Sequence, residues 1–420
     1  MSYDLRCFGW ESCVIPHSLK AIQTLIPQWN DLKILRHKTN TPHGKTKPDE
    51  LQLLNQFFKN AEKKPYMPGY TKTSKIGDGS YAHIYLGKRG VFFPINGKTD
   101  GIVHISRNVP MDEICIKEVS LKVTRDEQRG SPKTRKGAYA DEIRAILHEA
   151  FLHALVLKVF EHQGLPKQVP FLHEVVGLTK RGHSTNSPDD FEAVWIVMEL
   201  LRGQTLENYL KRHLEPHEFE ANETILIDIL VQLAYYLQIL QKILRFNHRD
   251  MKLNNLYVRA HESNVWTKSL EIPDFGSYAC QLDLTLLDFG FSCIGCEQEG
   301  TTLVSAGSWF DEGDRCFKPG RDLCTFLYAL HSVFPLPYFV SPAFYGLLRQ
   351  AMFAKHGELT YDLLRGIDIH GTPNTSAHPI AIQFHQGIYK FLSKDNVEMT
   401  GCEPSAFLKA LHEYMVAELP

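Results

Sequence analysis

"NHRDMKLNN", residues 247–255, is the stretch whose order of residue types says most about the fold and chemistry of the chain. It directly follows an apolar run at 223–246, which we expect to form a buried helix. Asp250 and Asn255 lie five positions apart, a spacing that suits a tight loop in which a carboxylate faces a hydroxyl nucleophile and an amide oxygen faces a metal ion. Lys252 would then lie beside a phosphoryl group in transfer.

The tripeptide Asp-Phe-Gly occurs twice after this loop, beginning at Asp274 and at Asp288. Leucines alternate through 282–286, which predicts a strand that runs into the second copy. Pro273 precedes the first copy and cannot donate a ladder hydrogen bond, so we expect Asp274 to lie in a hairpin loop. A metal-binding carboxylate needs a rigid support, which a strand end gives better than a loop. Asp288 is therefore the functional candidate, and the first copy is a chance resemblance.

Two features upstream are typical of a phosphate-binding sheet. "IGDGSYAHI", residues 76–84, places Gly77 and Gly79 in a predicted strand–turn–strand, where a backbone without Cβ can approach phosphate closely. "ICIK" places Lys117 at the end of an apolar strand, on the opposite face from Ile116. Each feature alone is also found in ordinary hairpins and strand edges, so their weight comes from occurring together.

The composition is that of an ordinary soluble globular protein, with 43% hydrophobic and 22% charged residues over 420 positions. The formal net charge of -2 gives no general attraction to nucleic acid, so no nucleic-acid partner is expected. The nine cysteines lack a framework spacing and residues 1–18 lack a signal-peptide pattern, which favours an intracellular, cytoplasmic location. Polar residues interrupt the run at 223–246, so we expect no membrane span. The sequence leaves the oligomeric state open.

Taken together, these residues resemble the eukaryotic-type protein kinase superfamily, and within it the Ser/Thr kinases. The match follows the family's order from about 70 to 335. It implies an α+β, two-lobed fold, with a small antiparallel-sheet N-lobe at 70–201 and a mainly helical C-lobe at 202–420. Residues 1–69 are expected to form a helical N-terminal extension.

The resemblance also implies a role for each matching residue, with ATP and Mg²⁺ as cofactors. Asp250 and Lys252 are the expected catalytic residues, and Asn255 and Asp288 are the expected metal ligands. Asp322 matches the buried Asp that opens a large-lobe helix. The expected nucleotide-binding residues are those of the Gly-rich loop, the phosphate-anchoring Lys with its helix Glu, and the hinge: Ile76, Gly77, Gly79, Ala82, Ile84, Lys117, Glu149, Met198, Glu199 and Leu201.

Two carboxylates are candidates for the partner of Lys117. Glu149 lies in the middle of the helix expected at 138–162, where the family has its Glu. Glu142 lies nearer the start of that helix and is followed four residues later by Ile146, which is a better apolar spine residue than the His that follows Glu149 at the same spacing. We favour Glu149 and leave Glu142 open.

Some features depart from the common family pattern. Asn255 and Asp288 are 33 residues apart, and no Ala-Pro-Glu closes the segment after the second triad. These features resemble haspin-like kinases, and 307–335 resembles Ser/Thr kinases of large DNA viruses, for which host cytoplasm or the virion is the expected location. We expect an ATP-dependent kinase that acts on protein hydroxyls. The alternatives are a pseudokinase scaffold and a small-molecule kinase, and Lys252 together with His248-Arg249 argues against the latter.

Overall fold

The computed structural model describes ten segments of the chain, which are residues 67–78, 82–92, 112–121, 132–165, 167–179, 191–260, 268–295, 302–305, 317–353 and 399–418. They are of mixed α/β type, with four antiparallel sheets and six α-helices in the described part. The chain divides into two compact units. We call them the sheet unit (described residues up to Lys158, and Pro170–Leu201) and the helical unit (Val159–Val169, and the described residues from Arg202 onward). The predicted extension at 1–69 lies almost wholly outside the described residues.

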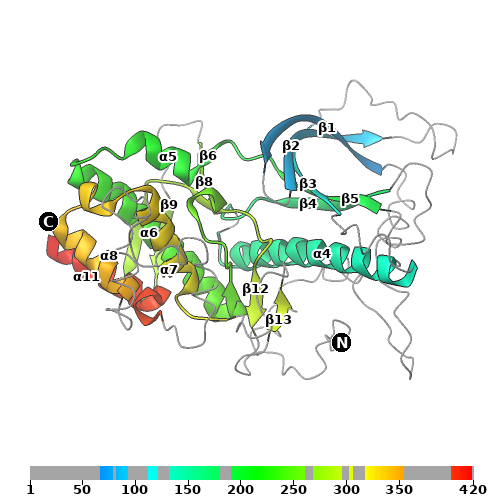
Figure 1. Ribbon diagram of the computed structural model, residues 1–420. Helices are drawn as coiled ribbons and strands as arrows, with labels where there is room; N and C mark the ends of the chain where they lie inside the picture. Colours follow the sequence, from blue (N-terminus) through cyan, green and yellow to red (C-terminus); the bar gives the residue numbers. More distant parts are fainter. Residues whose placement is uncertain are drawn as a thin grey trace, which may run out of the picture. The chain divides into compact units, whose positions relative to one another are not determined.

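The sheet unit contains one five-stranded antiparallel sheet in the order β1-β2-β3-β5-β4 (Figure 1). The register places Ile84 of β2, Lys117 of β3 and Ile196 of β5 side by side on one face. Cys115 shares that face, whereas Ile114 and Ile116 lie on the other, as the sequence predicts. The strand bounds are β1 Met67–Asp78, β2 Ala82–Phe92, β3 Asp112–Ser120, β4 Leu172–Thr179 and β5 Phe191–Glu199.

Helix α4, Pro132–His162, covers the face of the sheet that carries Lys117 (Figure 1). Ile146 and Ala150 of the helix pack against Val194 and Ile196 of β5. The helix begins at Pro132, earlier than the expected 138. Proline suits the first turn because that turn's N–H groups have no partner within the helix.

The helical unit is built around helix α6, Phe219–Leu244, which packs against α7 and α11 (Figure 1). It is the only described helix long and apolar enough to cross a membrane, and 78% of its most apolar window is buried inside the protein. Such burial is typical of a core helix. The other helices of the unit are α5 Leu206–His213, α7 Arg321–Val333, α8 Pro342–Phe353 and α11 Pro404–Glu418.

Short strands precede α6, connect it to the second Asp-Phe-Gly copy and follow that copy. They form the sheets β13-β12-β7, β11-β8-β6 and β10-β9. The 3-10 turn η5, Leu253–Asn255, lies between β7 and β8, and the turns η6 and η7 cover Leu336–Tyr338 and Thr400–Cys402. The strand bounds are β6 Gly203–Thr205, β7 Phe246–Asn247, β8 Leu256–Arg259, β9 Lys268–Ile272, β10 Gly276–Cys280, β11 Leu284–Leu286, β12 Cys293–Gly295 and β13 Thr302–Ser305.

The strand expected before Asp288 is shorter than predicted. β11 spans only Leu284–Leu286 and ends two residues before the aspartate. All three of its residues are buried, including Thr285, so the strand has no exposed face. The alternating leucines therefore located the strand correctly, but the prediction that it runs straight into the triad is wrong.

The described cysteines are mostly free thiols. Cys115, Cys280, Cys324 and Cys402 are unpaired, whereas Cys293 of β12 is disulfide-bonded. One bonded cysteine in the described part does not amount to the dense framework found in small secreted domains.

Candidate active site

The loop after α6 is held in shape by one buried carboxylate. Asp322, in the first turn of α7, is fully buried. Its Oδ2 accepts hydrogen bonds from Asn247 Nδ2 at 3.1 Å and from His248 N at 2.8 Å, and its Oδ1 accepts one from Arg249 N at 2.8 Å. Hydrogen bonds to a buried charged group are among the stronger ones in proteins. Three donors from consecutive residues therefore fix the entry to the loop.

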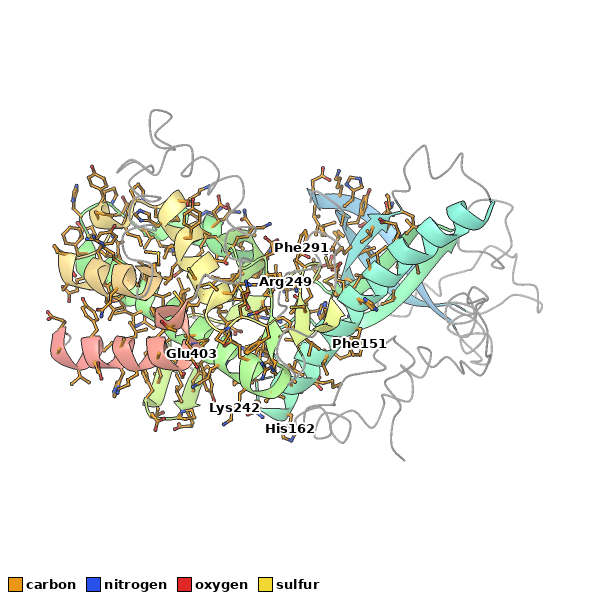
Figure 2. All side chains as sticks on the ribbon, turned by 60° about the horizontal axis from the view of Figure 1, so that its bottom comes forward. Phe151, His162, Lys242, Arg249, Phe291 and Glu403 are labelled. Atoms are coloured by element: carbon orange, nitrogen blue, oxygen red, sulfur yellow. The ribbon has the colours of Figure 1, made fainter. Side chains whose placement is uncertain are left out.

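Backbone geometry at two positions supports this anchor. Arg249 has a φ of 64°, a conformation that is uncommon for a residue other than glycine. Arg249 belongs to the helical unit, is labelled in Figure 2 and is only 3% exposed. Gly320, directly before α7, has a φ of 79°, and a Cβ there would lie 2.2 Å from the carbonyl oxygen of Met399. Strained residues persist only where their surroundings determine them, and they are frequent at functional sites.

The loop brings the three predicted residues Asp250, Lys252 and Asn255 into direct contact. Asp250 Oδ2 accepts hydrogen bonds from Lys252 Nζ and from Asn255 Nδ2, each at 2.8 Å. Asn255 Nδ2 also donates to the carbonyl oxygen of Asp250 at 2.7 Å. The Asp250 side chain is 8% exposed and that of Lys252 45% exposed, so a nearly buried carboxylate meets a cation that reaches solvent.

These contacts determine the orientation of the Asn255 amide. Both of its partners are acceptors, so the group that faces them must be Nδ2. Oδ1 is then the amide atom that remains as an acceptor for a ligand. An amide oxygen next to a fixed carboxylate suits a hard cation.

Two hydrogen bonds, one from the backbone and one from a side chain, join this loop to the second triad at Leu287. Leu287 N donates to the carbonyl oxygen of Asn255 at 2.8 Å. His248 Nε2 lies 2.8 Å from the carbonyl oxygen of Leu287 and is the donor, because a carbonyl can only accept. The residue directly before Asp288 is therefore held by both ends of the loop.

The second triad continues from this anchor. Asp288 is exposed and has a φ of 58°, and its Oδ1 accepts a hydrogen bond from Gly290 N at 3.2 Å. Phe289 is 1% exposed, and its ring centroid lies 5.4 Å from that of His248 and 6.2 Å from that of Phe246. The buried ring places the carboxylate of Asp288 at the surface of the loop.

The first triad is a hairpin turn, which confirms its predicted location. Residues 273–275 connect β9 to β10, and Phe275 N donates to the carbonyl oxygen of Ile272 at 3.1 Å. Asp274 is exposed with a φ of 63°. Phe275 packs against His412 of α11, with ring centroids 4.7 Å apart. The first triad thus attaches the hairpin to the C-terminal helix.

Within the sheet unit, Lys117 pairs with Glu149. Lys117 Nζ lies 2.5 Å from Glu149 Oε1, and the two side chains are 11% and 12% exposed. Of the two carboxylates that the sequence left open, Glu149 is thus the one that makes this ion pair. A nearly buried pair is costly to form unless its geometry is good, so it also restrains both side chains.

The other predicted nucleotide-binding residues lie along β1, β2 and the end of β5. Ile76 is 52% exposed and Gly77 pairs with Ile84. Ala82 is buried at the start of β2. Gly79 lies outside the described residues. The hinge residues Met198, Glu199 and Leu201 are each half-buried.

The donor atoms of the loop fit a magnesium ion that is shared with phosphates. Asn255 and Asp288 offer oxygen ligands, which Mg²⁺ prefers, and Mg²⁺ usually takes only one or two protein carboxylates. Over the described segments, no group of three or more His, Cys, Asp or Glu residues could hold a metal by itself. Asn255 Oδ1 and the Asp288 carboxylate thus offer two oxygen atoms of the kind that ligate Mg²⁺.

A buried polar network next to β11 was not predicted from the sequence. Asp228 and Gln232 of α6 are fully buried. Burial raises the pKa of Asp228 to about 6, and hydrogen bonds, among them one from Leu282, oppose the rise. Burial also lowers the pKa of Lys268 to about 8. Polar residues four positions apart in an apolar helix were the available signal, but the spacing alone does not identify their partners.

The chain matches no protein-family model, and no curated protein matches its sequence.

Proposed function

We propose that the protein is an ATP-dependent serine/threonine protein kinase with the two-lobed fold of the protein kinase superfamily. One observation carries the proposal. Asp250, Lys252 and Asn255 form a hydrogen-bonded loop, and Leu287 attaches the Asp288 segment to both ends of that loop. The order and contacts of these groups are those that phosphoryl transfer to a hydroxyl requires.

The proposed roles follow from the chemistry of each group. When bound, Mg-ATP supplies the phosphoryl group and the cation that neutralises its charge. Asp250 orients the substrate hydroxyl and accepts its proton, and its hydrogen bonds with Lys252 and Asn255 hold the carboxylate in one orientation. Lys252 stabilises negative charge on the transferring group. Asn255 Oδ1 and the Asp288 carboxylate hold the metal ion.

In the sheet unit, Lys117 is the proposed phosphate ligand. Its ion pair with Glu149 restrains a long side chain that would otherwise lose much conformational freedom on binding a ligand. Met198, Glu199 and Leu201 are the proposed hinge contacts of the nucleotide. The proposed substrates are proteins, since the loop carries Lys252, which the resemblance associates with Ser/Thr kinases.

The test is Mg²⁺-dependent transfer of the γ-phosphoryl group of ATP to a generic basic protein. We expect the wild-type protein to transfer phosphate, and Asp250→Asn to lose about a thousandfold or more in rate, because the general base and its charge are removed. Asn254→Ala is the matched control, since Asn254 is exposed in the same loop. Transfer by Asp250→Asn above about a tenth of the wild-type rate would count against the proposal. A folded wild-type protein without transfer would favour a pseudokinase scaffold.

A further inference from the structure

Helix α6 carries a row of buried polar side chains, which is unusual for a core helix. Asp228, Gln232 and Tyr236 follow one another at intervals of four residues, so they lie on one face, and each has no exposed surface. Burying such groups costs free energy unless each finds a hydrogen-bond partner. The location of their partners therefore indicates which parts of the fold they hold together.

The first set of partners is the backbone at Leu282, two residues before β11. Leu282 N donates to Asp228 Oδ2 at 2.8 Å, and the carbonyl oxygen of Leu282 accepts from Gln232 Nε2 at 2.9 Å. Gln232 Nε2 also donates to Asp228 Oδ2 at 3.1 Å. Both polar backbone groups of Leu282 are thus bound by side chains of α6.

The second set of partners is the hairpin β9–β10. Tyr236 Oη donates to Gln232 Oε1 at 2.9 Å and accepts from Lys268 Nζ at 3.1 Å. Lys268 opens β9, and its Nζ also lies 5.3 Å from the centroid of the Tyr236 ring. The neighbouring Tyr235 donates to the carbonyl oxygen of Glu271 at 2.9 Å. One chain of hydrogen bonds therefore runs from the hairpin through α6 to the start of β11.

β11 needs such support because its own ladder is short. It pairs with β8 over only three residues, Leu284–Leu286. Beside this ladder, the carbonyl oxygen of Asp283 accepts from Arg259 N at 3.0 Å, and Leu286 N donates to the carbonyl oxygen of Gln168 at 2.8 Å. Thr285 Oγ1 donates to the carbonyl oxygen of Lys167 at 3.0 Å. The bonds at Leu287 follow, and then Asp288. A shift at Leu282 would be transmitted through this short segment to the proposed metal ligand.

We propose that Asp228, Gln232, Tyr236 and Lys268 form a positioning network for the segment 282–288. Gln232 is its central positioning residue because it bonds to Asp228, Leu282 and Tyr236 at once. The expected effect on metal binding rests on the proposed function, whereas the hydrogen-bonded link between α6 and Leu282 does not. A network that only stabilised the fold would leave the local order of 282–288 and the Mg²⁺ requirement unchanged in the molecules that remain folded.

The experiment compares Gln232→Leu with Gln238→Leu in the full chain. Both changes remove an amide from the same helix, but Gln238 Oε1 has no hydrogen-bond partner in the described part. We expect backbone hydrogen exchange in 282–290, measured without ligand, to be about tenfold faster in Gln232→Leu and unchanged in Gln238→Leu. Tyr236→Phe removes only one oxygen, and it should make exchange in 282–290 about threefold faster. If Gln232→Leu does not fold, the exchange rate of Tyr236→Phe alone tests the positioning network.

Enzymatic assays then test the functional consequence. The Mg²⁺ concentration for half-maximal turnover should rise about tenfold in Gln232→Leu, as for other residues that orient a metal ligand. Gln238→Leu should retain the wild-type value. Equal exchange in the two leucine variants, with Tyr236→Phe like wild type, would overturn the positioning network. If exchange responds as expected but the wild-type protein shows no turnover, the proposed function fails and the network stands.

Discussion

The two Asp-Phe-Gly triads of this protein begin with aspartates of similar φ, but they differ at their glycines and in their surroundings. Asp274 and Asp288 have φ values of 63° and 58°, and both are exposed. Phe289 is 1% exposed against His248 and Phe246, beside the loop held by Asp322. Phe275, at the tip of a hairpin, is only half-buried and packs on Tyr278 and His412. The same tripeptide thus occurs in two different settings, and the residues that hold each copy decide what it can do.

The largest expected difference between the triads is in turnover. Asp288→Asn should lower Mg²⁺-dependent phosphoryl transfer by roughly a thousandfold or more, because phosphoryl charge is left uncompensated. Asp274→Asn should retain a rate close to wild type, since its carboxylate lies in a turn on the hairpin. Assays of the two variants side by side at millimolar Mg²⁺ check this. An inactive Asp274→Asn variant together with an active Asp288→Asn variant would contradict this expected difference between the triads.

The second difference is in stability. Phe289→Ala should lower the free energy of unfolding by about 3–5 kcal/mol, because it leaves a cavity beside His248 and Phe246. Phe275→Ala should cost less, about 1–2 kcal/mol, since its ring is already partly exposed. Urea denaturation of both variants measures the two losses. Equal losses would mean that the hairpin turn is as strongly supported as the loop.

The third expectation concerns how stability depends on pH through Asp228, which binds the backbone at Leu282 between the two triads. Burial raises the pKa of Asp228 to about 6, so its protonated form stabilises the folded state. That contribution is complete below the unfolded-state pKa, near 4, and is lost as the pH rises to about 6. The unfolding free energy of the wild type, relative to Asp228→Asn, should therefore fall by at most about 3 kcal/mol between pH 4 and 6. Denaturation at several pH values tests this, and a constant difference between the proteins would contradict it.

The smallest effect is expected at the backbone of the first triad. Asp274→Gly should change the unfolding free energy by less than about 1 kcal/mol, because glycine relieves the positive φ but gains entropy in the unfolded chain. Asp274→Val should cost about 1–2 kcal/mol, since a β-branched residue is strained at that φ. Melting curves of the two variants give the comparison. If valine is tolerated as well as glycine, the turn conformation does not matter to the fold.

Much of the loop and sheet was predictable because short patterns determine them. The apolar helix before His248, the strand that carries Lys117 and the hairpin at Pro273 follow from local periodicity and from the missing N–H of proline. Lys117 was expected at the end of its strand, but β3 continues to Ser120. The ion pair of Lys117 with Glu149 agrees with the favoured alternative, although the sequence did not exclude Glu142.

What the sequence could not supply depends on contacts between distant segments. The observed strand β11 is shorter than the predicted one. Its residues Leu284, Thr285 and Leu286 are all buried, so the alternation of leucines does not mark a buried and an exposed face there. The bonds from Gln232 to Leu282 and to Tyr236 join residues whose proximity follows only from the packing of the hairpin on α6. The positive φ of Asp288 likewise depends on the anchor at Leu287.

Binding of Mn²⁺ in the presence of ATP, followed by electron paramagnetic resonance, is the most direct test of the proposed metal site. Mn²⁺ takes the same oxygen ligands as Mg²⁺ and can stand in for it. We expect the wild-type protein and Asp274→Asn to give the same bound signal, and Asp288→Asn to lose it at the same concentrations. Loss of the signal in Asp274→Asn, with its retention in Asp288→Asn, would contradict the assignment of the metal ligand to the second triad.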